Sequence, residues 1–378
     1  MDALRASSMF LLIPAHAAIL LAINGHPGAW SSAIFWTIHL FRLPLFFAMS
    51  GFFLVLLLGS KGLRRTARNR TLRIVVPLAV GLVTLVPLYV LASQLTNTVI
   101  AADGEQIEGT PFIFEPSYLW FLWYLLIIDG LAIASYLLLP GLLRAGERGF
   151  RAAMGRPLLG VLVLAVPTAL VLLPYEAWVM EPDTATFVPE PAALAYYGIF
   201  FAFGASLSAN RDLITRASAK SWSWSAWALV ATIPAGAFYA LHNSAAHADR
   251  FAIHVSAMLI YAIATWTCLV ALVALASRYL AHPRPATRYI ADCSYWIYLS
   301  HLPAMVLLIA LAGILTLGTA PAYAFVVIAT LAFAMATYPL FVRYTPIGTM
   351  LNGRRERPSR PRREPPAQAE AEAIESAT

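Results

Sequence analysis

Long apolar runs separated by short polar connections make up almost the whole chain. Each run is about 20 residues long, which is the length that a helix needs to cross a bilayer. We count ten such runs, at residues 6–24, 33–59, 72–93, 117–139, 157–173, 192–209, 222–241, 251–276, 289–312 and 321–342. The pattern predicts an all-α polytopic membrane protein, built as a single bundle of about ten transmembrane helices.

The polar connections differ in charge from one side of this predicted bundle to the other. With ten crossings, one side holds all but two of the 26 basic residues, the exceptions being Arg42 and Arg250. The connections on the other side are acidic, with carboxylates between 103 and 115 and between 176 and 190. Basic connections remain in the cytoplasm, so we expect both termini to be cytoplasmic.

Composition agrees with a membrane protein and limits the kinds of partner that we expect. Hydrophobic residues make up 60% of the chain and charged residues 12%, whereas soluble domains carry about 25% charged residues. The net charge of +7 follows from the cytoplasmic connections, so we expect a lipid bilayer as partner and no nucleic acid. The two cysteines, Cys268 and Cys293, lie in apolar runs and indicate neither a disulfide framework nor a metal site.

The domain organisation is simple. We expect residues 1–345 to form one transmembrane domain, whose first apolar run is a membrane span and not a cleaved signal peptide. Residues 346–378 form the predicted cytoplasmic tail. This tail is rich in Arg, Pro, Glu and Ala, a composition typical of a largely disordered segment.

Arg5 and His16 form the most informative pair of polar residues. Eleven helical steps of about 100° return to nearly the same face and climb roughly 16 Å, about half the thickness of the hydrocarbon layer. The spacing thus predicts an arginine at the cytoplasmic surface and a histidine near the midplane. Ionisable groups at that depth are costly and usually functional.

Three more ionisable residues, Arg42, Asp129 and His301, fall at similar depth on other predicted spans, and His39 lies one turn from Arg42. Together with His16 they suggest a shared polar cavity. Two structural alternatives remain open: a lone membrane histidine often links helices by a hydrogen bond, and Arg42 could pair with Asp129 as a lock. The arginines between 64 and 73 could set topology or bind an anionic cytoplasmic ligand.

Four blocks of the chain resemble the membrane acyltransferase 3 family. They are the opening segment 2–16 with its Arg5-to-His16 spacing, FRLPLFFAMSGFF at 41–53, LWFLWY at 119–124 and SYWIYLSHLP at 294–303. The motif His39-x-x-Arg42 and the closing TPIG at 345–348 are most similar to the glucans biosynthesis protein C branch. That branch resembles enzymes that add succinyl groups to osmoregulated periplasmic glucans.

The resemblance implies a membrane O-acyltransferase over residues 1–345, in a bacterial cytoplasmic (inner) membrane. Cytoplasmic acyl-CoA (succinyl-CoA or acetyl-CoA) would donate the acyl group as a substrate, with no cofactor bound permanently, to a hydroxyl of an extracytoplasmic carbohydrate such as periplasmic glucan. An anionic donor needs a basic entrance, and a histidine suits the deprotonation of a hydroxyl.

We therefore assign expected roles to ten residues. His16 is the expected general base, and Arg42 or His301 orients the acceptor or stabilises the oxyanion. The donor would be held by Arg5, Arg68, Arg70 and Arg73. The acceptor side would include His39, Asp129 and Tyr298, and we expect no metal ligand.

A different class of protein could also use a polar cavity at the midplane. A transporter or flippase for an anionic or sugar-linked solute needs such a cavity, but the sequence has no repeated halves and no paired broken helices. A membrane sensor or scaffold would leave the cluster of ionisable groups unexplained.

Overall fold

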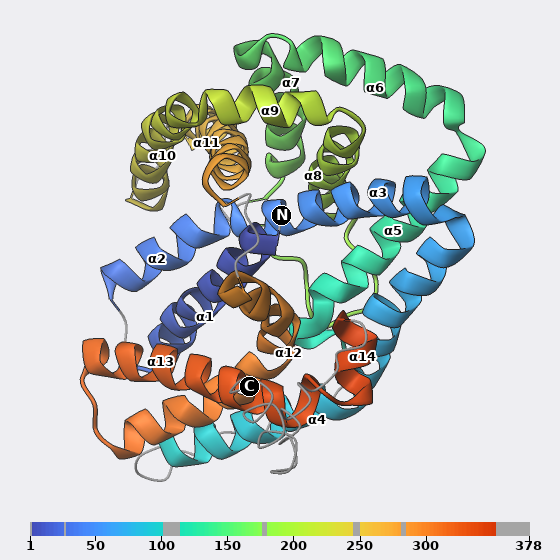
Figure 1. The fold of residues 1–378 in the computed structure, drawn as a ribbon. Helices are drawn as coiled ribbons and strands as arrows, with labels where there is room; N and C mark the ends of the chain where they lie inside the picture. The colour runs from blue at the N-terminus through green and yellow to red at the C-terminus, as the bar shows by residue number, and fades with distance from the viewer. Residues whose placement is uncertain are drawn as a thin grey trace, which may run out of the picture.

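The computed structural model describes residues 2–25, 28–100, 114–175, 180–244, 250–280 and 285–352, whose regular structure is entirely helical (Figure 1). The predicted all-α fold is confirmed. The longer helices are α1 (Asp2–Ile23), α2 (Ala29–His39), α3 (Arg42–Arg70), α4 (Val76–Ile100), α5 (Trp120–Leu138), α6 (Pro140–Met154), α7 (Pro157–Leu172), α8 (Pro191–Ala209), α9 (Arg211–Ala219), α10 (Ser221–Ser244), α11 (Arg250–Tyr279), α12 (Pro285–Ile314) and α13 (Thr319–Thr337). Short helical turns complete them: η1 (Thr71–Val75), η2 (Ser117–Leu119), η3 (Tyr338–Val342) and α14 (Pro346–Asn352).

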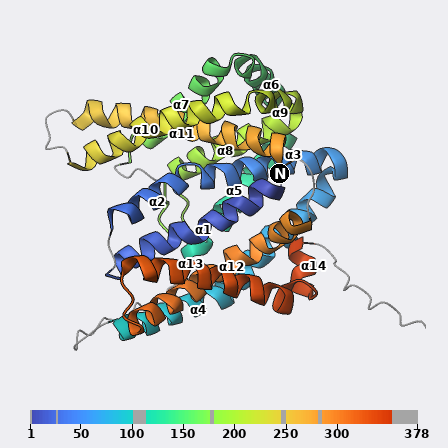
Figure 2. The same cartoon turned by 60° about the vertical axis from the view of Figure 1, so that its left-hand side comes forward.

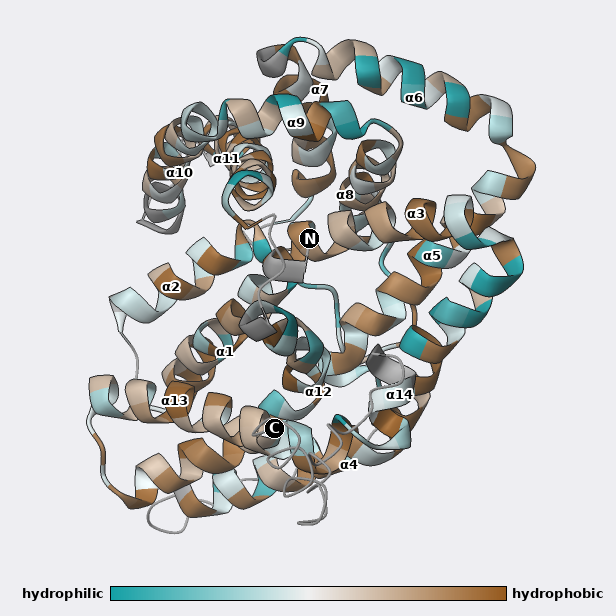
Figure 3. Cartoon of the chain, viewed as in Figure 1, coloured by the Kyte–Doolittle hydropathy of each residue, from teal (hydrophilic) through white to brown (hydrophobic). Residues whose placement is uncertain are grey.

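Seven stretches of the described chain are long and apolar enough to cross a membrane. The longest, Trp30–Val99, contains α2, α3 and α4, so it covers two of the predicted spans. Of the remaining predicted spans, 157–173 coincides with the shorter apolar helix α7, and 222–241 lies within α10. Hydrophobic residues cover most helices, while hydrophilic ones gather on α6 and at the bend between α3 and α4 (Figure 3). The chain is an integral membrane protein, and both the count of about ten crossings and the cytoplasmic termini stay predictions.

The predicted span 33–59 is two helices, not one. Helix α2 ends at His39 and α3 begins at Arg42. Pro44 accounts for the break, because its nitrogen carries no hydrogen and its ring would clash with the carbonyl of Leu40 in a continuous helix. The break places His39 and Arg42 at facing helix ends.

The predicted connection between the spans 33–59 and 72–93 is also helical. Helix α3 bends at Gly62, whose φ of 73° lies in the left-handed region that glycine tolerates, and then continues to Arg70. The bend brings Arg70 back to its own helix, where Nη1 donates to Ser50 Oγ (3.1 Å) and Nη2 donates to the Ser50 carbonyl (2.8 Å). A straight helix of 20 residues spans about 30 Å, so this contact requires the bend.

The helices pack in two groups around a middle set. Helices α7 to α11 lie on one side, with α10 along α11, and α12 packs against α4 and α13 on the other (Figures 1 and 2). Between them lie α1, α2, α3 and α5. Helix α3 packs closely against α8. Gly51 of α3 lies against the carbonyl of Phe201, and Gly204 of α8 lies against the carbonyl of Ala48. The middle helices carry the polar residues that the sequence analysis singled out.

Candidate active site

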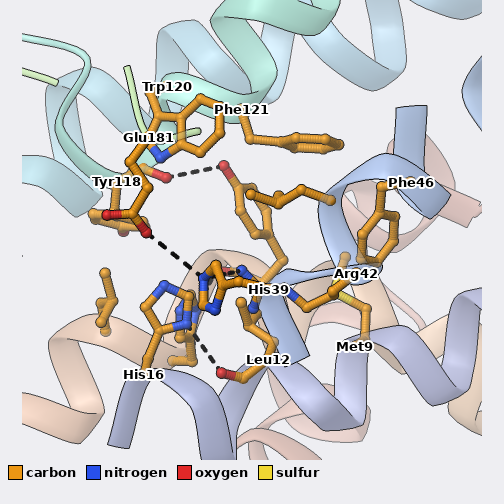
Figure 4. Close-up of a pocket in the computed structure, with 14 residues that line it drawn as sticks. Met9, Leu12, His16, His39, Arg42, Phe46, Tyr118, Trp120, Phe121 and Glu181 are labelled. Carbon is orange, nitrogen blue, oxygen red and sulfur yellow. Dashed lines mark hydrogen bonds and ion pairs between the residues drawn. The ribbon is translucent and has the colours of Figure 1, made fainter. Parts of the chain in front are cut away.

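A small cavity lies where α1, α2, α3, α5 and α12 meet. Its volume is about 60 Å³. The polar part of its lining consists of His16, His39, Arg42, Tyr298 and His301, together with Tyr118, Trp120 and Glu181 (Figure 4). The ring centroid of His16 lies 5.1 Å from that of His301 and 6.1 Å from that of His39. We call this cavity the histidine pocket, and it brings together five of the ten residues expected from the sequence.

All three histidines of the pocket are held in the same way by their own helices. Nδ1 lies 3.0 Å from the Leu12 carbonyl in His16, 2.8 Å from the Phe35 carbonyl in His39 and 2.6 Å from the Tyr298 carbonyl in His301. A carbonyl oxygen only accepts, so these contacts assign the proton to Nδ1 and leave a lone pair on Nε2. Nε2 of His301 is buried without a hydrogen-bond partner among the described residues. A neutral imidazole with a free lone pair is the form that a general base requires.

Arg42 supplies unused donors to the same pocket. Its side chain is buried, and Nη2 donates to Nε2 of His39 at 3.2 Å. Nε and Nη1 are buried with no hydrogen-bond partner in the described part of the chain. Buried donors of this kind are costly unless a ligand satisfies them. An oxyanion or a carboxylate is the ligand that a guanidinium binds most strongly.

Glu181 completes the lining and was not predicted. It comes from the segment 180–190 between α7 and α8, and its Oε1 lies 3.7 Å from Nε2 of His39. The glutamate side chain is 53% exposed, whereas that of His39 is 1% exposed. Burial raises the pKa of the Glu181 carboxyl, and the charge of Arg42 partly opposes this. The only sequence signal was its place in an acidic connection, because no spacing relates it to His39.

A second and larger cavity lies next to the histidine pocket. It has a volume of about 400 Å³, and four cationic side chains line it: Arg5, Lys61, Arg70 and Arg73. We call it the basic cavity. Both cavities share four lining residues, Met9, Phe46, Phe121 and Tyr298, which form a partition between them. Arg5 and His16 therefore lie in neighbouring cavities, one on each side of the partition.

Comparison with known proteins identifies the family. A family model described as an acyltransferase domain, that of acyltransferase 3, matches residues 1–339. The chain belongs to the acyltransferase 3 family. This confirms the resemblance drawn from the four sequence blocks.

Curated relatives point to the expected branch of the family. Glucans biosynthesis protein C of Salmonella gallinarum is 25% identical over 323 residues, which cover 80% of this chain and 81% of the relative. The protein of the same name from Salmonella heidelberg is 25% identical over 330 residues, with the same coverage. No solved structure gives a significant match.

The family blocks meet around the two cavities. The block 41–53 begins α3 with Arg42, the block 119–124 places Trp120 and Phe121 on α5, and the block 294–303 contributes Tyr298 and His301. Within the described residues, no group of three or more potential ligands is placed to hold a metal ion. The family membership and the geometry thus concern the same side chains.

Two expected site residues lie outside both cavities. Asp129 faces Arg70, with Oδ1 3.7 Å from Nε, and not Arg42. The Arg42–Asp129 lock weighed from the sequence is therefore not the arrangement in the structure, where Arg42 donates to His39 instead. Arg68 is on the exposed face of α3 and is absent from the described lining of the basic cavity. Its expected contact with the donor remains a prediction.

Proposed function

We propose that this membrane acyltransferase moves a succinyl or acetyl group from cytoplasmic acyl-CoA to a hydroxyl of an extracytoplasmic carbohydrate, such as a periplasmic glucan. The observation that carries the proposal is the pair of adjoining cavities, one cationic and one lined by neutral histidines. The relatives named glucans biosynthesis protein C support a glucan as the acceptor.

The basic cavity suits the donor. Coenzyme A carries several phosphate charges, and guanidinium groups bind phosphate through paired hydrogen bonds. Arg5, Arg70 and Arg73 come from two different parts of the chain and line one cavity. In the proposed complex they hold the nucleotide portion, while the thioester reaches the partition at Tyr298.

The histidine pocket suits the transfer. Nε2 of His16 takes the proton from the acceptor hydroxyl as its oxygen attacks the thioester carbonyl. Free N–H groups of Arg42 stabilise the oxyanion of the tetrahedral intermediate, and His301 orients the acceptor. The carbon–sulfur bond then breaks, and the proton passes from His16 to the thiolate. The products are the O-acyl carbohydrate and free coenzyme A.

The experiment is acyl transfer in proteoliposomes that contain the purified protein, with labelled succinyl-CoA or acetyl-CoA inside and a gluco-oligosaccharide outside. Mass spectrometry of the oligosaccharide identifies the acyl group and the acceptor together. We expect His16→Ala to lower the rate of transfer by about 10²–10⁴-fold, with membrane insertion unchanged.

A matched control is His254→Ala, because His254 also bonds a carbonyl, that of Leu173, but lies outside the described lining of both cavities. This variant should retain the rate of the unmodified protein. Unreduced transfer by His16→Ala would disprove the assigned base. Movement of a solute across the bilayer without acyl-CoA would favour the transporter alternative.

A further inference from the structure

We propose that Glu181 and Trp120 form an acceptor subsite at the mouth of the histidine pocket, which binds an uncharged polyol and disfavours an anionic one. This inference rests on the proposed function, because it names the residues that would hold its acceptor. It concerns a part of the pocket that the transfer chemistry does not use.

Exposure differs across the lining of the pocket and indicates where an acceptor enters. His39, Arg42 and His301 are buried, whereas the Glu181 side chain is 53% exposed. An acceptor that enters past Glu181 would bring its reacting hydroxyl to His16 and leave the rest of its ring beside the glutamate. Glu181 and Trp120 lie on the side of the pocket opposite His16 and Leu12, where that ring would be (Figure 4).

Glu181 has the hydrogen-bonding capacity that such a ring needs. Its carboxylate faces the pocket at His39 while half of the side chain remains exposed. Its Oε1 lies 3.7 Å from Nε2 of His39, beyond hydrogen-bond distance, and that nitrogen already accepts from Arg42. Within the described residues the carboxylate therefore accepts no hydrogen bond. A carboxylate accepts up to about four hydrogen bonds. Most of its lone pairs are therefore available for the hydroxyls of a ligand.

The segment that carries Glu181 is fixed to the helices on both sides. The Tyr197 hydroxyl of α8 donates to the carbonyl of Met180, directly before Glu181. Trp123 Nε1 of α5 donates to the Phe187 carbonyl at 3.1 Å. The segment therefore positions Glu181 in advance, which is what a selective binding site requires.

Glu190 ties the far end of the same segment. Its Oε1 accepts from the backbone N–H of Asp183 at 2.7 Å, and its Oε2 accepts from the Tyr175 hydroxyl at 2.9 Å. Its own N–H donates to the Tyr124 hydroxyl at 2.9 Å. Three bonds to one residue close the segment into a compact unit next to the pocket.

Trp120 is a partly buried indole that lines the same pocket as the Glu181 carboxylate. Its indole is held at 5.7 Å from the ring centroid of Tyr197 and at 5.8 Å from that of Tyr124. The C–H face of a sugar ring packs on the face of an indole, while its hydroxyls point outward to polar groups. A carboxylate beside an indole thus matches a neutral sugar. The negative charge repels an acceptor that carries its own carboxylate or sulfate.

The test uses Glu181→Gln, which keeps the shape of the side chain and removes its charge. Two probes are compared in the proteoliposome assay, a neutral gluco-oligosaccharide and the same oligosaccharide with one uronic acid. Losing a hydrogen bond to a charged group should raise the KM for the neutral acceptor by about tenfold. The KM for acyl-CoA should stay constant, and the preference for the neutral acceptor should fall.

Asp183→Asn is the matched control, because Asp183 is a carboxylate in the same segment but caps the N–H of Ala185 and is absent from the described lining of the pocket. It should leave both KM values unchanged. An unaltered neutral-to-anionic preference in a folded Glu181→Gln protein would overturn the subsite. A rise in the KM for acyl-CoA that equals the rise for the acceptor would overturn it too.

Binding without turnover separates this inference from the proposed function. We expect the neutral gluco-oligosaccharide to bind His16→Ala in nanodiscs, and to bind about tenfold more weakly when Glu181→Gln is added. If the unmodified protein transfers no acyl group but binds the oligosaccharide through Glu181, the proposed reaction is wrong and the subsite stands. If transfer occurs and Glu181 affects neither binding nor KM, the subsite is wrong and the reaction stands.

Discussion

At the scale of single residues, Arg42 is a buried side chain whose hydrogen bonding is incomplete without a ligand. One nitrogen bonds His39, while Nε and Nη1 are buried and have no hydrogen-bond partner among the described residues. Burial of such donors is normally avoided, which fits the oxyanion-binding role proposed for Arg42. The planar arrangement of these N–H groups is a property of arginine that lysine lacks.

We therefore expect Arg42→Lys to lower kcat by about 10²–10³-fold, the usual effect of losing one oxyanion donor. The positive charge remains, so the folded protein should retain its thermal stability. Arg65→Lys is the control, since Arg65 lies on the exposed surface of the same helix. Steady-state kinetics of acyl transfer measure the effect. A kcat equal to that of the unmodified protein would exclude Arg42 from the transition state.

The residues of the histidine pocket were partly predictable. Depth in the membrane follows from helix rise, and it placed His16, Arg42 and His301 at one level. Depth does not give the direction in which a side chain points around its helix axis. The contact of Asp129 with Arg70, and not with Arg42, could therefore not be predicted from depth. Glu181 was beyond prediction, because its position over His39 depends on contacts between different helices and its segment. Tyr197 of α8 donates to the Met180 carbonyl, and the N–H of Glu190 donates to the Tyr124 hydroxyl of α5.

At the scale of helices, the packing of α3 against α8 helps to position Arg42, because α3 begins at this residue. A Cβ atom added at Gly51 would overlap the carbonyl oxygen of Phe201, and one added at Gly204 would overlap that of Ala48. Small residues let two membrane helices approach at the backbone, where dispersion forces act over many atoms. Any larger side chain must push the helices apart.

Gly51→Ala should thus destabilise the protein by about 1–3 kcal/mol, the usual cost of overpacking. Because α3 begins with Arg42, the shift should also reduce transfer. Thermal unfolding in detergent measures the first effect. Gly59→Ala is the control on the same helix, since a Cβ there meets nothing within 4 Å, and it should unfold at the original temperature. Equal unfolding temperatures for Gly51→Ala and Gly59→Ala would contradict the close contact.

Helix positions were better predicted than helix ends. Apolar runs locate a helix, and each of the ten predicted ranges is helical over most of its length. Two boundaries were missed for different reasons. Hydrophobicity continues across Pro44, which divides α2 from α3, whereas α3 continues beyond Gly62 through basic residues. A charged segment reads as a loop in the sequence, but here its polar face meets Ser50 and a cavity.

At the scale of the whole molecule, the orientation in the membrane decides which cavity faces which compartment. The charge distribution predicts that the bend after Gly62 lies in the cytoplasm and that the segment 180–190 lies outside. We expect Asp183→Cys to react with an impermeant maleimide in intact cells, and Arg65→Cys to react only after permeabilisation. Replacing Cys268 and Cys293 by alanine removes the background reaction. The opposite labelling pattern would mean that the predicted orientation is wrong and that transfer runs in the opposite direction.

The partition of Met9, Phe46, Phe121 and Tyr298 has an electrical consequence. Water-filled cavities on its two sides would concentrate the membrane voltage across this thin layer of side chains. In the proposed orientation, a succinyl group carries one negative charge outward through it, toward the positive side of an energised membrane. The voltage then favours succinyl transfer by up to about 2.3 kcal/mol per 100 mV, while a neutral acetyl group gains nothing. The rate of succinylation, unlike that of acetylation, would follow the energy state of the cell.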